Sequence, residues 1–136
     1  PAIGEAGDVD TAVVTLKSAN GAMGVIDTSR RAVYGYDQRV EVFGSDGAVM
    51  DVNDTPDNAV YYGADGTVSS PCYKIMWDRY TSAFAAEQQA FAEAVINGTQ
   101  PLATGEDGLY PILIAAAATK SLKEGRPVKI SEIEAV

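Results

Sequence analysis

Residues 34–39, Tyr-Gly-Tyr-Asp-Gln-Arg, form the densest cluster of polar and aromatic side chains in the sequence. A segment that joins two strands can place such phenol hydroxyls, carboxylates and guanidinium groups around a cleft. Hydroxyl groups of a polyol accept hydrogen bonds from arginine and donate them to aspartate, while aromatic faces cover the C–H surface of a ring. The cluster therefore indicates a polyol site. The alternative is an ordinary strand connection with aromatic anchors and a surface ion pair between Asp37 and Arg39.

Several groups that catalytic sites need are absent from the sequence. It has no histidine and one cysteine, which excludes Ser-His-Asp and Cys-His nucleophiles and most zinc sites. It also contains no Gly-x-Gly-x-x-Gly and no P-loop pattern, so we expect this chain alone to bind no dinucleotide. We interpret Cys72 as a small packing residue rather than a nucleophile.

A second group of oxygen-bearing side chains lies at residues 51–57, where Asp51, Asn53, Asp54 and Asp57 stand close together. A calcium loop of the EF-hand type requires other residues where Thr55 and Pro56 stand. We interpret the segment as a solvated acidic turn and expect no metal site.

The charge balance excludes two classes of partner. Ten Lys and Arg residues oppose nineteen Asp and Glu residues, giving a formal charge of -9. Such a field repels phosphate backbones and anionic lipid surfaces, so neither nucleic acid nor a membrane is expected as a partner. No apolar run approaches the roughly 20 residues of a membrane span and no signal pattern is present. The expected location is cytoplasmic.

Chain length and turn patterns predict one domain that begins with strands. We expect residues 1–8 to be a tail or linker remnant and residues 9–136 to form a single domain with a genuine core. Asn-Gly and Asp-Gly pairs favour the tight turns of hairpins. The expected strands are 11–18 paired with 22–30, 40–43 paired with 48–52, and 59–62 followed by 67–69, with a last short strand at 128–130.

The hydrophobic period then changes to that of helices. Aromatic and apolar residues from Trp77 to Val95 recur at helical spacing and predict a helix over 79–96. Thr104 and Asp107 resemble a capping box, so a second helix should follow. Pro111 implies that this helix either starts later than the cap suggests or bends there.

Strands first and helices last predict an α+β fold: an open, mostly antiparallel sheet with two main helices packed on one face. More apolar strand residues are present than one helical layer needs to cover. We therefore expect the other sheet face to meet a second copy or another domain, through Val13, Val25, Val42, Met50 and Tyr61.

Residues 21–44, GAMGVIDTSRRAVYGYDQRVEVFG, closely resemble the C-terminal domain of inositol 2-dehydrogenases in the Gfo/Idh/MocA oxidoreductase family. Later pieces follow the order of that family: Arg79-Tyr80, Pro101-Leu102, residues 104–108 (TGEDG) and residues 121–128 (SLKEGRPV). The resemblance covers roughly residues 9–130. It implies a second domain that supplies part of the substrate pocket and the oligomer interface, with NAD or NADP held by a Rossmann domain that this chain lacks.

The resemblance also implies residue roles. Tyr34 and Tyr36 would line the pocket of a cyclic polyol such as myo-inositol, or of a related sugar, and Tyr80 would close it. Arg39 would contribute to substrate binding, or would instead hold the loop through Asp37. The catalytic lysine, aspartate and histidine motifs of the family have no counterpart here, so the chain is expected to be inactive alone. The competing hypothesis is a non-catalytic, self-associating structural or ligand-binding module.

Overall fold

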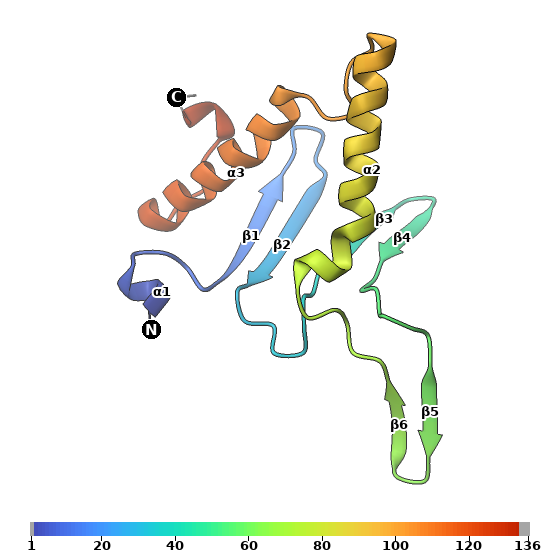
Figure 1. Cartoon of the computed structure of the whole chain (residues 1–136). Coiled ribbons are helices and arrows are strands. Elements are labelled where there is room, and N and C mark those ends of the chain that lie inside the picture. The colour runs from blue at the N-terminus through green and yellow to red at the C-terminus, as the bar shows by residue number, and fades with distance from the viewer. Residues whose placement is uncertain (1, 134–136) are drawn as a thin grey trace. The chain divides into compact units, whose positions relative to one another are not determined.

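The computed structural model describes residues 2–133, which divide into two compact units at residue 84. The first unit holds a short helix, α1 (Ala2–Glu5), three hairpins and the start of helix α2, and the second holds the rest of α2 and the remaining helices (Figure 1). The order of strands before helices agrees with the α+β class predicted from the sequence.

Three antiparallel hairpins form the first unit, and the turn signals in the sequence locate all of them. Each hairpin is a two-stranded sheet of its own in the described chain. Their registers pair opposite side chains such as Val42 with Val49 and Tyr61 with Val68. The strands are β1 (Thr11–Lys17) with β2 (Met23–Ser29), β3 (Val40–Gly44) with β4 (Gly47–Asp51), and β5 (Val60–Gly63) with β6 (Gly66–Ser69).

Two long helices follow: α2 (Met76–Asn97) and α3 (Gly105–Glu124). The capping box predicted for α3 is present, because Thr104 Oγ1 accepts from the Asp107 backbone N–H and the Asp107 carboxylate accepts from the Thr104 backbone N–H. The helix therefore starts where its cap indicates, with Pro111 inside it. A later start, one of the two alternatives for Pro111, is wrong.

Two local predictions differ from the structure. Residues 2–5 form one helical turn where a tail was expected. The strand predicted at 128–130 is absent, and residues 130–132 form a 3-10 helix, η1 (Ile130–Glu132). Its carboxylate, Glu132, accepts hydrogen bonds from the Lys129 backbone N–H and from Arg126, at 2.8 and 2.7 Å. These local bonds offer the backbone an alternative to a strand ladder.

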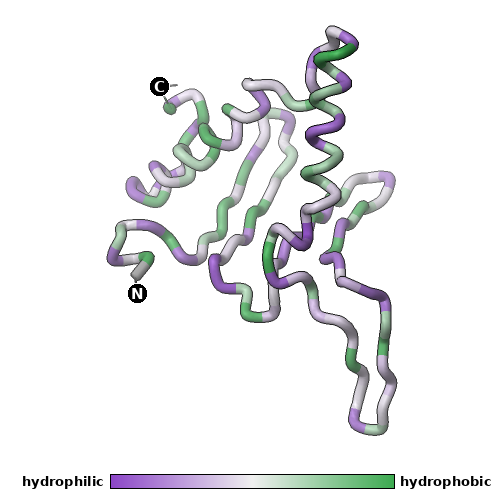
Figure 2. The backbone as a smooth tube through the Cα atoms, viewed as in Figure 1, coloured by the Kyte–Doolittle hydropathy of each residue, from purple (hydrophilic) through white to green (hydrophobic). Residues whose placement is uncertain are grey.

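The expected core is small in each unit taken by itself. Among the described residues, the buried apolar side chains are Ala94 and Ala117, both in the second unit. Hydrophobic residues instead recur along all the hairpins and helices (Figure 2), and many large ones are exposed. Each unit taken by itself therefore buries fewer apolar side chains than the chain length led us to expect. Within residues 2–133 no helix is long and apolar enough to cross a membrane.

Candidate functional site

Gly35 fixes the path of the segment that joins β2 to β3. Its backbone φ is +139°, and a Cβ there would lie 2.7 Å from both Cys72 Sγ and the Tyr73 carbonyl oxygen. The next residue continues this contact, since the Tyr36 N–H donates to the Tyr73 carbonyl at 2.7 Å. Residues 34–36 therefore pack closely against residues 72–73. Only a glycine fits at position 35 in this arrangement. Cys72 acts here as a packing residue.

The Asp37 carboxylate is the centre of the segment. Arg39 donates to it in a bidentate fashion, Nε to Oδ1 and Nη2 to Oδ2, both at 2.9 Å. The Tyr34 hydroxyl donates to Oδ2 and the Asn53 side-chain amide donates to Oδ1. Four donors match the roughly four lone-pair sites of a carboxylate. Asp37 therefore has no acceptor site left for a ligand hydroxyl.

This arrangement changes the acidity of both partners. Hydrogen bonds from Tyr34, Arg39 and Asn53 lower the pKa of Asp37 from 3.8 to about 2. The same bond to Asp37 is the main cause that raises the pKa of Tyr34 above 10.0. Asp37 is thus ionised at neutral pH and Tyr34 keeps its proton, which favours a structural anion over a general base.

The Arg39 side chain binds Asp37, as the alternative to a substrate contact predicted. Its side chain is 65% exposed, whereas that of Asp37 is 14% exposed, so the arginine covers the carboxylate from the solvent side. Within the described residues, its side-chain hydrogen bonds both go to Asp37. The structure therefore shows Arg39 holding the loop, and its predicted contact with substrate stays a prediction.

Tyr36 and Tyr80, which are 44 positions apart in the sequence, meet in the structure. Their ring centroids lie 5.8 Å apart with the planes at 90°, an edge-to-face pair. Both side chains are half-buried. The Tyr80 hydroxyl donates to the Gln38 side-chain oxygen. Within residues 2–133 the Tyr36 hydroxyl makes no hydrogen bond, so Tyr36 is the tyrosine of this group with both donor and acceptor capacity free.

Two further residues of the cluster were missed by the sequence analysis. Asn53 lies in the segment interpreted as a solvated acidic turn, but its Oδ1 accepts from the Gln38 backbone N–H at 2.9 Å while its amide donates to Asp37. Arg79 stands out in the sequence only as part of a helix start, yet it is 9% exposed and donates to the Gln38 carbonyl at 3.1 Å. The sequence does not reveal these contacts, because the partners of both residues lie in residues 37–38, far away along the chain.

The charge of Arg79 is balanced at a distance. Burial by itself would lower its pKa, but Tyr80 and the carboxylates of Asp54 and Asp51 outweigh burial, and the net direction is upward. Tyr80 and the carboxylates of the acidic segment thus favour the charged form of this guanidinium. No group of acidic, histidine or cysteine side chains able to hold a metal ion occurs in the described part of the chain.

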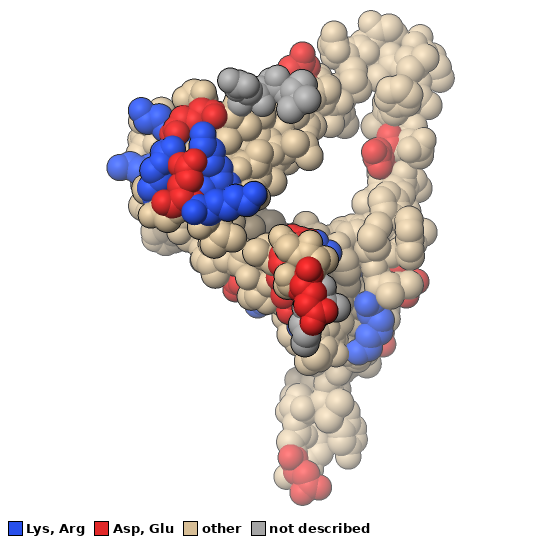
Figure 3. Space-filling model, turned by 90° about the vertical axis from the view of Figure 1, so that its left-hand side faces the viewer, with Lys and Arg blue, Asp and Glu red and all other residues tan. Residues whose placement is uncertain are grey.

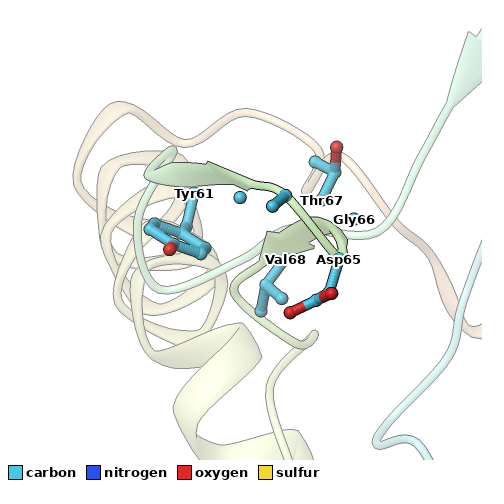
Figure 4. A pocket seen from close by; sticks show the side chains of 7 residues that line it. Tyr61, Asp65, Gly66, Thr67 and Val68 are labelled. Carbon is cyan, nitrogen blue, oxygen red and sulfur yellow. The ribbon is translucent and has the colours of Figure 1, made fainter.

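A small pocket lies at the tip of the β5–β6 hairpin (Figure 4). Tyr61, Asp65 and Val68 are among its lining side chains, and its volume is about 180 Å³. Pockets for small ligands usually hold roughly 300–1,000 Å³. It contains none of the four predicted substrate-binding residues.

In the second unit, charged side chains pair with one another. Arg126 contacts Glu124 and Glu132 at 2.6 and 2.7 Å, and Lys120 lies 3.9 Å from Glu132. In Figure 3 basic side chains intermix with acidic ones in one cluster of the displayed face, while several other acidic side chains stand apart. These surface ion pairs lie at the C-terminal end of α3. The cationic groups are engaged with carboxylates of the chain itself, so they do not indicate a ligand site.

Replacing Gly35 by alanine should disrupt the site, and the chain offers a matched control. Gly66 has nearly the same φ, +137°, but nothing lies within 4 Å of the position that a Cβ would take there. Both substitutions strain the backbone by about 1–3 kcal/mol, and Gly35→Ala adds a clash with Cys72 and Tyr73. Urea denaturation of the full-length protein should show the larger loss for Gly35→Ala. Equal losses would contradict the close approach.

Acid should release the Asp37 contacts. Because the folded-state pKa of Asp37 is about 2 against an ordinary 3.8, its contribution to stability is complete above about pH 4 and is lost as the pH falls toward 2. The difference in unfolding free energy between wild type and Asp37→Asn should shrink over that window. Carbon-13 NMR of the carboxyl measures the midpoint directly, and a midpoint near 4 would contradict the network.

Comparisons with known proteins identify the family of the chain. Residues 2–130 match the profile of the oxidoreductase family, C-terminal alpha/beta domain. The chain is 47% identical over 131 residues to the myo-inositol 2-dehydrogenase of Thermotoga maritima, covering 96% of this chain and 39% of that protein. It is 32% identical to the scyllo-inositol 2-dehydrogenase (NAD(+)) of Bacillus subtilis (strain 168), covering 96% of this chain and 38% of that protein.

A solved structure confirms the fold over nearly the whole chain. The crystal structure of a probable dehydrogenase from Thermotoga maritima superposes with a TM-score of 0.92 at 46% identity, covering 96% of this chain and 39% of that chain. This chain thus spans about two fifths of the length of the relatives that it matches. The α+β prediction is confirmed, and the chain belongs to the oxidoreductase family as its C-terminal alpha/beta domain.

Proposed function

We propose that this chain is the substrate-binding and oligomerisation domain of an NAD(P)-dependent dehydrogenase. The enzyme oxidises a secondary hydroxyl of a cyclic polyol such as myo-inositol, or of a related sugar, to the ketone. One observation carries the proposal: Asp37 fixes a loop that brings Tyr36, with a free hydroxyl, against Tyr80. The names of the inositol dehydrogenases that the chain resembles support the choice of a cyclic polyol.

The tyrosines supply complementary hydrogen bonds for a ring of hydroxyl groups. The Tyr34 hydroxyl already donates a hydrogen bond to Asp37, and the Tyr80 hydroxyl donates one to Gln38. Toward a substrate, both oxygens can therefore only accept hydrogen bonds. Tyr36 can donate as well as accept. A polyol hydroxyl that donates to one tyrosine and accepts from another is held in one orientation, which is the positioning that rate enhancement requires.

No catalytic residue is assigned to this chain. Its ionised candidate base, Asp37, is saturated with donors and has a pKa of about 2, so it does not accept a proton from a polyol hydroxyl at neutral pH. The sequence also contains no Gly-x-Gly-x-x-Gly pattern for a dinucleotide. When bound elsewhere in the full-length protein, NAD or NADP accepts the hydride, and a relative named for NAD(+) supports NAD. The isolated chain is therefore inactive, and calorimetry should detect no tight NAD binding to it.

Tyr36→Phe in the full-length enzyme tests the proposed substrate site. One neutral hydrogen bond contributes about 0.5–1.5 kcal/mol, so kcat/KM for myo-inositol should fall about 2- to 13-fold with the KM for NAD and the melting temperature unchanged. Tyr62→Phe, an exposed tyrosine on β5, is the matched control and should leave the kinetics unaltered. A lower melting temperature with untouched polyol kinetics would make Tyr36 a packing residue instead.

We also propose that the exposed sheet faces bind a second copy of the protein. Val13 and Val25 lie on the same face of the first hairpin, because Val25 is the register partner of Thr15, and both are exposed. Val42, Met50 and Tyr61 are also exposed on the other two hairpins. The register pairs Val42 with Val49 and Met50 with Glu41, so Val42 and Met50 lie on opposite faces of their hairpin, and the expectation that both share one sheet face is wrong. Monomers rarely expose contiguous apolar patches above a few hundred Å², so exposed valines on one hairpin face favour a face that is covered by a partner.

Light scattering of the full-length protein tests this interface. The wild type should be an oligomer, and Val13→Asp combined with Val25→Asp should shift it toward monomer, because the new carboxylates would be buried without partners. Thr28→Asp, on the opposite face of the same hairpin, serves as the control and should leave the mass unchanged. A wild type that stays monomeric at high micromolar concentration would refute the proposal.

A further inference from the structure

We propose that Asn53 and Arg79 are positioning residues of the polyol site, because together they hold residues 34–39 against the start of α2 and so set Tyr80 relative to Tyr36. This inference rests on the proposed function of the tyrosines. Neither residue contacts the substrate in this account. Both act through the backbone of Gln38. This residue directly follows Asp37 in the sequence, and its side chain accepts a hydrogen bond from Tyr80.

Asn53 links two neighbouring residues of the loop. Its amide donates to Asp37 Oδ1, and its oxygen accepts from the Gln38 backbone N–H at 2.9 Å. The two bonds require one donor and one acceptor on the same side chain, which an asparagine supplies. An aspartate at this position would direct a second carboxylate at Asp37, and an alanine would leave the Gln38 N–H without its acceptor.

Arg79 holds the other side of Gln38. Its Nη2 donates to the Gln38 carbonyl at 3.1 Å, and its Nη1 lies 3.5 Å from Asn53 Oδ1. The planar guanidinium therefore reaches two chain segments at once, which a lysine ammonium on its flexible stem does not reproduce. Its Nε is buried and has no partner among the described residues. A buried donor left unpaired is unfavourable, so stability alone does not account for the arginine.

Gln38 connects Asn53 and Arg79 directly to Tyr80. Gln38 is held through its N–H by Asn53 and through its carbonyl by Arg79, and its side-chain oxygen accepts from the Tyr80 hydroxyl. Tyr80 directly follows Arg79 on α2 and meets the ring of Tyr36 edge-on at 5.8 Å. Loss of either support frees Gln38, and the separation of the two rings is then no longer fixed.

Steady-state kinetics of the full-length enzyme with myo-inositol and NAD test the inference. Asn53→Ala and Arg79→Met should each lower kcat/KM for myo-inositol by about 10- to 100-fold, since misplacement of a bound substrate by about 1 Å has effects of that size. The KM for NAD should stay unchanged, and Arg79→Lys should fail to restore the wild-type value. Two matched controls are Asn58→Ala, at an exposed position of the same segment, and Arg31→Met, at a surface ion pair.

Coupling to Tyr80 separates positioning from general destabilisation. If Asn53 acts through Gln38 and Tyr80, the effects of Asn53→Ala and Tyr80→Phe on kcat/KM should be clearly less than additive. Additive effects, or a fall in melting temperature with unchanged polyol kinetics, would overturn the inference while Tyr36→Phe still reports a working substrate site. If Tyr36→Phe and Tyr80→Phe are both silent, the proposed function itself fails. Arg79 is more buried than Asn53, so Arg79→Met is the variant more at risk of not folding. In that case Asn53→Ala alone still tests the inference.

Discussion

The bidentate ion pair between Arg39 and Asp37 is the interaction on which the rest of the site depends. It gives a short, glycine-containing loop one conformation, because the same carboxylate also accepts from Tyr34 and from Asn53. A carboxylate with four donors is a rigid anchor and a poor proton acceptor. The loop is therefore suited to orient neutral hydroxyl groups rather than to accept a proton.

Local chemistry made much of the fold predictable. Asn-Gly and Asp-Gly turns determine each hairpin within a few residues, and the capping box at Thr104 sets the start of α3 even with Pro111 inside it. Prediction failed where non-local or ionic contacts decide: the Glu132 carboxylate favours a 3-10 turn over the last strand. The composition of residues 34–39 already indicated Tyr34 and Tyr36 as candidate site residues, and Tyr80 became a candidate only through the family resemblance. The contacts of Asn53 and Arg79 were not predictable, since their partners lie in other segments.

The exposed apolar side chains are consistent with a domain that completes its packing in a larger protein. Among the described side chains of the first unit, none that is apolar is buried, and the buried polar one is Arg79. Hydrogen bonds and an ion pair thus define the loop more than a hydrophobic core does. This explains why the loop depends on single residues such as Gly35. A Cβ at this position would clash with the Cys72 side chain and with backbone carbonyl oxygens that cannot easily move away.

The structure of the full-length protein with myo-inositol and NAD bound is the most direct test of this account. It predicts the Tyr36 hydroxyl within hydrogen-bond distance, about 2.7–2.8 Å, of a ring hydroxyl, with Asp37 still bound to Tyr34, Arg39 and Asn53. A polyol bound away from Tyr36, or an Asp37 carboxylate that leaves Arg39 to accept from a ring hydroxyl, would contradict it.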